Sequence, residues 1–328
     1  MKRSVAAVLG VALLAPAAAS ADGLPIMGVD GRQGVVSRDG GYRYVTFPNV
    51  DDNSTLVARV HTQGGEIARH RTIAGRFTVP VVAYDGSTDG LSGDAGRLFL
   101  IRPRTGLAQK RTRLAILDTR LQVRKQIVLQ GDFSFDALSP DGSTAYLIEY
   151  LSLSRHNFDP SNYRVRVLDT ASGRLLHAPI VDPREPDEKM GGLPITRTMS
   201  PDGRWAYTLY SGSEHPFVHA LDTTGRAARC IDLDALTGRE DLFQLRLRVT
   251  QGGGRLDIVK GDTPMLLVDT HSFAVSEPRT APQRAARPAT KTPDDGTSAW
   301  PWVAGAAALL VLLGVASARP LARAARAR

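Results

Sequence analysis

A short acidic run, Asp-Gly-Ser-Thr-Asp-Gly at positions 85–90, contains the residues whose types and spacing best suit the binding of a metal ion. The side chains of Asp85, Ser87 and Asp89 alternate as oxygen ligands do at the start of a calcium-binding loop. The twelfth residue of such a loop is an acid that closes the site, but here it is Gly96. Because that ligand is missing, we interpret the run as a Gly/Asp turn, and Ca2+ bound by Asp85, Ser87 and Asp89 is the alternative.

Two histidines and the single cysteine are not predicted to form a metal site. His215 and His219 are four residues apart, a spacing that brings two rings to one ion only on a helix. Pro216 and the alternating pattern after it predict a strand, on which such residues stand ~13 Å apart. We therefore expect two unrelated surface or edge histidines. Cys230 lies in an apolar-alternating stretch and is expected to be buried and unreactive.

A repeat organises the segments that carry these residues. The pattern of an apolar residue, Asp and Thr ends four strand-like runs, and a fifth copy with His in place of Asp precedes them. The threonines of the five copies are 47 to 57 residues apart, at Thr62, Thr119, Thr170, Thr223 and Thr270. Such regular spacing indicates a repeated structural unit.

A second marker, Ser-Pro-Asp-Gly, occurs at 139–142 and 200–203, with a weaker version, Ser-Arg-Asp-Gly, at 37–40. Serine accepts hydrogen bonds within the turn, proline presets its φ angle and glycine ends the reversal, so the tetrad predicts a tight turn between strands. In the unit at 133–181, four short alternating segments follow the pattern of half-buried strands. The only short helix candidate in the body is 234–247.

Four strands per unit predict an all-β fold, a β-propeller in which radial closure hides the sheet edges. We count five blades, with residues 28–36 giving the first inner strand, and a degenerate copy at 77–84 leaves six as an alternative. The Ser-Pro-Asp-Gly turn and the Val-x-Val-Leu-Asp-Thr strand after it resemble the YVTN and PD40 (TolB-like) propeller repeats. Some propellers of this kind resemble lactonases, but no residue here maps onto a lactonase site.

The propeller topology predicts a binding face. Second-to-third and fourth-to-first connections of a four-stranded blade emerge on one side, and they include the long segments 102–113, 152–163, 182–192 and 212–216. Loops held by a rigid scaffold commonly carry binding residues. The predicted ligand- or partner-binding residues are Arg102, Arg104, Lys110, Arg111, Arg155, His156, Tyr163, Asp187 and Glu188. The alternative is that these loops are simply solvated.

The two ends of the chain predict export at the N-terminus and attachment to a membrane at the C-terminus. Residues 1–21 have the charged start, short apolar core and Ala-Ser-Ala site of a cleaved signal peptide. Residues 299–318 carry no charge, are long enough for a membrane-spanning helix and are followed by arginines, which predicts a cytoplasmic C-terminus. The remaining segments are then an extracellular body, a disordered Pro/Ala/Thr stalk and a basic cytoplasmic tail, at 22–275, 276–298 and 319–328.

The net charge of +8 does not indicate a nucleic-acid partner. Six of these charges belong to residues at the two ends, namely Lys2, Arg3, Arg319, Arg323, Arg326 and Arg328. The body is therefore nearly neutral. H-E-x-x-H, G-x-S-x-G and P-loop motifs are missing from the sequence.

The sequence therefore favours a cell-surface binding or scaffold module displayed from the membrane of a bacterial-type envelope. Its expected partner is an envelope protein or glycan, and no cofactor is expected apart from the Ca2+ alternative. Two other readings remain open. One is a propeller enzyme, either a lactonase-like hydrolase or a quinone-dependent oxidoreductase, and the other is a purely structural envelope protein.

Overall fold

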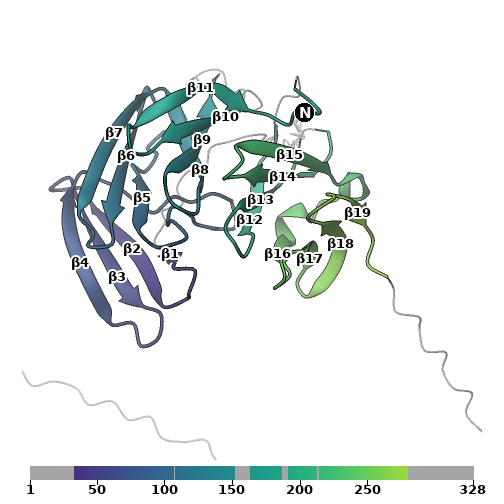
Figure 1. Ribbon diagram of the computed structural model, residues 1–328, viewed down its shortest axis with the longest axis horizontal. Helices are drawn as coiled ribbons and strands as arrows, with labels where there is room; N and C mark the ends of the chain where they lie inside the picture. Colours follow the sequence, from purple (N-terminus) through teal and green to yellow (C-terminus); the bar gives the residue numbers. More distant parts are fainter. Residues whose placement is uncertain (1–32, 107, 152–162, 187–190, 213, 280–328) are drawn as a thin grey trace, which may run out of the picture. The chain divides into compact units, whose positions relative to one another are not determined.

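The computed structural model describes residues 33–106, 108–151, 163–186, 191–212 and 214–279. They fold into five antiparallel β-sheets that follow one another along the chain, from the purple β1 to the yellow β19 in Figure 1. Within this described part, no helix is long and apolar enough to cross a membrane. The predicted signal peptide, 1–21, and the predicted span, 299–318, lie outside the described residues.

Each sheet is built from strands in chain order, so every connection within a sheet joins neighbours. The first sheet contains β1 (Val35–Val36), β2 (Tyr42–Asn49), β3 (Ser54–His61) and β4 (Ile67–Ala74). The second contains β5 (Arg97–Ile101), β6 (Arg111–Asp118) and β7 (Val123–Gln130). The third contains β8 (Asp132–Leu138), β9 (Thr144–Tyr150), β10 (Tyr163–Asp169) and β11 (Arg174–Ile180).

The last two sheets repeat the same plan. The fourth contains β12 (Pro194–Met199), β13 (Trp205–Tyr210), β14 (Phe217–Asp222) and β15 (Ala227–Asp232). The fifth contains β16 (Leu245–Val249), β17 (Arg255–Lys260), β18 (Thr263–Asp269) and β19 (Val275–Ser276). The helix candidate at 234–247 is wrong: Asp234–Leu236 and Leu242–Gln244 form single 3-10 turns, and β16 begins at Leu245.

The second sheet has no regular first strand. Isolated bridges join Thr78 to Ile101 and Leu91 to Leu98, so two short pieces of chain pair with β5 where a first strand would lie. Residues 77–84 therefore belong to this second unit. The alternative of a sixth blade is wrong for the described residues, which form five sheets.

Inner segments of four of the five sheets meet at one cavity, as the inner strands of propeller blades do. One cavity is lined by Val35 of β1, Leu138 of β8 and Met199 of β12, together with Leu91 from the second sheet. The last strands β4, β7 and β11 carry mostly exposed or half-exposed side chains. Hydrophobic clusters fill the space between neighbouring sheets, as where Leu117 packs with Val57. The described residues thus have the all-β architecture of a five-bladed propeller.

The predicted Ser-x-Asp-Gly turns are confirmed, and hydrogen bonds explain them. Ser139 Oγ donates to Asp141 Oδ1 at 2.6 Å and accepts from the Thr144 N–H at 3.0 Å, so one side chain closes the turn between β8 and β9. The threonine of the other marker completes the unit, because Thr170 Oγ1 donates to the Gly142 carbonyl at 2.7 Å. The two sequence markers therefore contact each other within one blade.

One copy of this turn was missed in the sequence. Ser92 Oγ donates to Asp94 Oδ1 at 2.6 Å and accepts from the Arg97 N–H at 2.9 Å, as in the other blades. The copy has Gly93 in place of proline and Ala95, with φ 53°, in place of the glycine. The Ser-x-Asp spacing was the signal that could have revealed it.

Candidate functional site

The two ends of the blades differ in their connections. The first-to-second and third-to-fourth connections all contain four or five residues, and we call the end they form the turn face. The other connections form the variable face. Apart from 75–96, which contains the irregular first part of the second sheet, their lengths range from one residue, Gly131, to thirteen residues at 181–193. The strand ends that the predicted long connections join therefore lie on one face. Folding alone requires only short turns.

Residues 79–89, which we call the inner loop, leave the second sheet and contact three others. The N–H groups of Tyr84 and Asp85 donate to the carbonyls of Pro194 and Ile195 on β12, at 2.8 and 3.1 Å. Thr88 Oγ1 donates to the Gly34 carbonyl beside β1 at 2.6 Å, and the Asp85 carboxylate lies 3.7 Å from Arg246 of β16. The inner loop therefore occupies the region between the first strands.

The three residues considered for calcium lie in this inner loop, and each makes protein contacts. Asp85 Oδ1 accepts from the N–H and hydroxyl of Ser87, at 2.9 and 2.6 Å. Asp89 Oδ1 accepts from the Gly90 N–H at 2.6 Å, and its other oxygen lies 3.9 Å from Arg197. This is a Gly/Asp turn with two differently partnered carboxylates. Calcium binding by Asp85, Ser87 and Asp89 stays an untested alternative.

A buried charged cluster lies beside the inner loop. Arg197 donates to the backbone carbonyl of Asp136 at 2.7 Å, to the Asp136 carboxylate and to Thr208 Oγ1 at 2.5 Å. Burial raises the pKa of Asp89 to about 6, although Arg197 opposes the shift. A cavity of about 270 Å³ reaches Asp89 and Arg197 from the side of the Ser-Pro-Asp-Gly turns. Asp89 can therefore change its charge near neutral pH.

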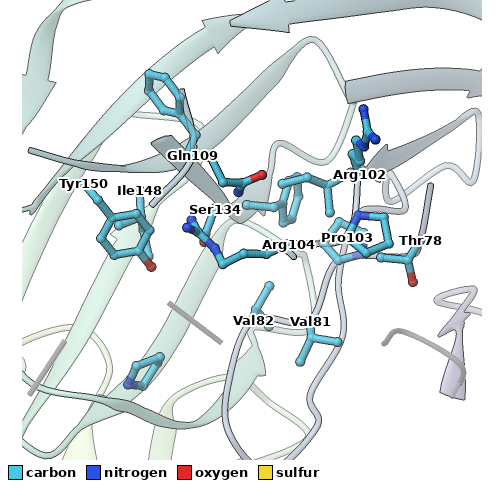
Figure 2. Close-up of a pocket in the computed structure, with 15 residues that line it drawn as sticks. Thr78, Val81, Val82, Arg102, Pro103, Arg104, Gln109, Ser134, Ile148 and Tyr150 are labelled. Carbon is cyan, nitrogen blue, oxygen red and sulfur yellow. The ribbon is translucent and has the colours of Figure 1, made fainter. Parts of the chain in front are cut away.

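A cleft opens between the inner loop, the 102–110 connection and strands β8 and β9. Its walls are largely apolar, and the cavity of about 60 Å³ is lined by Val81, Val82, Phe135 and Ile148 among others. In Figure 2 the Arg104 side chain extends across the pocket towards Tyr150, with Val81 and Val82 on one side and Gln109 and Ser134 on the other. An apolar floor with a few convergent polar groups is the usual make-up of a binding site.

Hydrogen bonds hold the Arg104 side chain rigidly in the cleft. Both terminal nitrogens of Arg104 donate to the Asp132 carboxylate, one at 2.9 Å, and the Gln109 N–H donates to the same carboxylate at 2.9 Å. The Arg104 guanidinium lies 5.3 Å from the centre of the Tyr150 ring. Burial raises the pKa of Tyr150 to about 12, so its hydroxyl stays protonated and can donate a hydrogen bond. The cleft thus offers fixed polar groups beside an apolar floor.

The structure brings only some of the predicted binding residues together. Arg102 and Arg104 both line the cleft, whereas Lys110 and Arg111 are exposed at the edge of β6. Tyr163 is buried, and its ring lies 6.1 Å from Tyr150 and 6.5 Å from Tyr210 between centroids. The other predicted residues lie outside the described ranges: Arg155, His156, Asp187 and Glu188.

The sequence reasoning missed the cleft residues Val81, Ile148 and Tyr150, and also Asp132, whose carboxylate holds Arg104. Val81 belongs to the inner loop, and Asp132 and Tyr150 are a cross-strand pair of β8 and β9. Strand alternation predicted such residues as core or solvent-facing positions. They line one cleft because the inner loop brings Val81 next to Ile148 and Tyr150 of β9.

The histidine prediction is wrong for one of the two residues. His215 lies at the surface and pairs with Asp232 at 3.0 Å, but His219 is buried with 1% of its surface exposed. Burial lowers the pKa of His219, so its ring is neutral. The prediction of a buried Cys230 is confirmed.

One group of metal-ligating side chains occurs among the described residues: Asp182, Glu185 and Cys230, with ligand atoms within 4.8 Å of one another. The Asp182 carboxylate already accepts from the Arg184 side chain, at 2.6 Å for the shortest contact, and from the Cys230 N–H at 3.0 Å. Burial opposes ionisation of Asp182, but the bonds from Arg184 lower its pKa to about 2. An ion there would have to compete with this arginine.

Comparisons with known proteins show similarity in fold. No family model and no curated protein match the chain. Among solved structures, a TolB protein from Agrobacterium tumefaciens is 16% identical over 74% of this chain and 78% of its own, with a TM-score of 0.43. TolB from Acinetobacter baumannii is 13% identical over 73% and 52%, with a TM-score of 0.39. The β-propeller domain of the Trilobed protease from Pyrococcus furiosus is 10% identical over 74% and 67%, with a TM-score of 0.43. We draw no function from these likenesses.

Proposed function

We propose that this chain is a binding propeller of a bacterial-type cell envelope that captures an envelope protein or glycan with its variable face. In this proposal residues 299–318 anchor it in the membrane, and the body lies outside. The observation that carries the proposal is the cleft, in which an apolar floor and the fixed Arg104–Asp132 pair meet on the face with the long connections.

The character of the cleft favours recognition of a partner's protruding group. Its volume of about 60 Å³ suits one inserted side chain or sugar substituent. The polar side chains of Gln109 and Ser134 line the same pocket as the cation–π pair of Arg104 and Tyr150. Aromatic and arginine side chains in desolvated pockets contribute a large share of binding energy at interfaces. Insertion of a partner group between these residues and Val81 would bury apolar surface from both molecules.

The test is capture of envelope partners by the full-length protein and a cleft variant. Val81→Lys places a charge on the half-buried cleft floor without removing the Arg104–Asp132 pair. Thr224→Lys adds the same charge at an exposed position of the turn face and serves as the matched control. We expect Val81→Lys to reduce capture by about tenfold or more, because desolvating the new charge opposes binding. Equal capture by both variants would contradict the proposal.

A hydrolytic enzyme is a second candidate, favoured by one observation. Asp89 has one carboxylate oxygen without a hydrogen-bond partner, lies beside a cavity of about 270 Å³ and has a pKa of about 6. A carboxylate with these properties could act as a general base near neutral pH. Asp89→Asn would then abolish hydrolysis of a lactone panel by the full-length protein while leaving partner capture unchanged. Hydrolysis that is missing in the wild type, or equal in Asp89→Asn, would remove this candidate.

A further inference from the structure

Three arginines converge on a second cavity of the variable face, which lies at the junction of the first and second sheets. The cavity has a volume of about 370 Å³ and is lined by Arg76, Arg102 and Arg113, with Asn53 and Gln126 beside them. Arg102 and Arg113 are held opposite each other, because the Arg102 N–H donates to the Arg113 carbonyl at 2.9 Å. We call these three residues the arginine pocket.

The guanidinium groups of the arginine pocket lack acidic partners among the described residues. Most buried or half-buried arginines elsewhere are paired, as Arg104 is with Asp132 and Arg197 with Asp136. Neither an ion pair nor a side-chain hydrogen bond joins Arg76, Arg102 or Arg113 to any residue of the described ranges. The nearby turn between β2 and β3 contains Asp51 and Asp52, which also form no ion pair with them.

Three adjacent like charges raise the energy of the empty pocket. Burial lowers the pKa of Arg102, and the charges of Arg76 and Arg113 lower it further. Arg76 and Arg102 are half-buried, so water screens them less than fully exposed arginines. An anion placed among the three groups would remove this repulsion and supply the missing hydrogen-bond acceptors.

We propose that the arginine pocket binds a tetrahedral oxyanion, namely the phosphate or sulfate group of a ligand. The planar fork of each guanidinium matches two oxygens of such a group, and three forks can share its oxygens. A dianion balances more of the three positive charges than a carboxylate does. The amides of Asn53 and Gln126 add neutral donors at the wall of the same cavity. This inference goes beyond the proposed capture of a partner at the cleft, and it requires no partner.

Isothermal titration of the full-length protein with inorganic phosphate, inorganic sulfate and acetate, at constant ionic strength, tests the inference directly. We expect phosphate or sulfate to bind the wild type more tightly than acetate, and Arg76→Gln and Arg102→Gln to weaken that binding about tenfold or more. The matched control is Arg120→Gln, which removes an exposed arginine from the turn-face end of the same sheet. This variant should bind like the wild type.

The outcomes separate this inference from the proposed function. Preference for phosphate or for sulfate tells which ester the pocket recognises, and either supports the inference. Absent binding, binding equal to that of acetate, or equal loss in Arg120→Gln would overturn it, whatever Val81→Lys does to partner capture. If Arg102→Gln does not fold, Arg113→Gln at an exposed position gives the same test. Melting without added anion should not be lowered by either change, since each relieves like-charge repulsion.

Discussion

The turn face and the variable face satisfy their polar groups in opposite ways. On the turn face, each aspartate of the repeat accepts hydrogen bonds from its own turn, and the bond from Ser139 lowers the pKa of Asp141. Towards the variable face, burial raises the pKa of Tyr150 and Tyr163 instead. Among the described residues, the buried side-chain atoms without a hydrogen-bond partner include the Tyr163 hydroxyl and, beside the cavity under the turns, Asp89 Oδ2, but no atom of the repeated turns themselves.

This difference separates the residues that specify the fold from those free to serve binding. A turn that satisfies its own donors and acceptors folds in the same way in every blade, so it can be repeated. Buried polar groups without full partners cost free energy, and they are typically found where a function requires them. We therefore expect changes on the turn face to alter stability, and changes on the variable face to alter recognition.

The largest expected effect comes from Asp89, whose pKa of about 6 lies above its ordinary value of 3.8. Burial favours the protonated form, so the stability that this carboxyl contributes is present below pH 3.8 and is lost as the pH rises through about 6. Asp89→Asn cannot ionise and should gain stability relative to the wild type, on the order of 3 kcal/mol, across that interval. Urea unfolding of both proteins at pH 4 and pH 7 measures this gain. If the free energies of unfolding of Asp89→Asn and the wild type differ by the same amount at both pH values, the raised pKa of Asp89 is contradicted.

A slightly smaller effect is expected at Gly142 of the turn face. Gly142 has φ +67°, and an added Cβ would lie 3.0–3.2 Å from atoms of Arg97 and Ser92. Gly142→Val should therefore lower the free energy of unfolding by about 1–3 kcal/mol. Gly106→Val, on the variable face, has no atom within 4 Å of its added Cβ and should cost much less. Equal melting temperatures for the two variants would contradict the claim that changes on the turn face alter stability more than changes on the variable face.

The smallest effect, and the opposite pH dependence, is expected at Asp141. Its pKa lies below 3.8 because Ser139 and the Ser143 N–H donate to it, so its contribution is present above pH 3.8 and is lost as the pH falls through the folded-state pKa. Asp141→Asn should cost about 0.5–1 kcal/mol at pH 7, since the group is largely solvated. That cost should shrink towards pH 3 in urea titrations. A cost that grew on acidification would show that the turn does not stabilise the carboxylate.

The sequence predicted what depends on near neighbours along the chain. Ser139 and Asp141 are two residues apart, so their hydrogen bond could be anticipated from the tetrad, and the four-stranded units followed from strand alternation. The ion pair of Asp136 and Arg197 joins residues 61 positions apart on β8 and β12, so it depends on how the third and fourth sheets pack. Arg102 and Arg104 were predicted from connection length, but Asp132 and Tyr150, the partners of Arg104, lie on strands whose alternation gave no sign of a site.

The central claim, that the variable face rather than the turn face meets the partner, is tested most directly by site-specific photo-crosslinking. A photoreactive residue would replace Val81 in the cleft or Thr224 on the turn face of the full-length protein, and irradiation would follow in intact cells. The account predicts one dominant adduct from position 81 and none from position 224. Adducts from position 224 alone, or of equal yield from both positions, would contradict it.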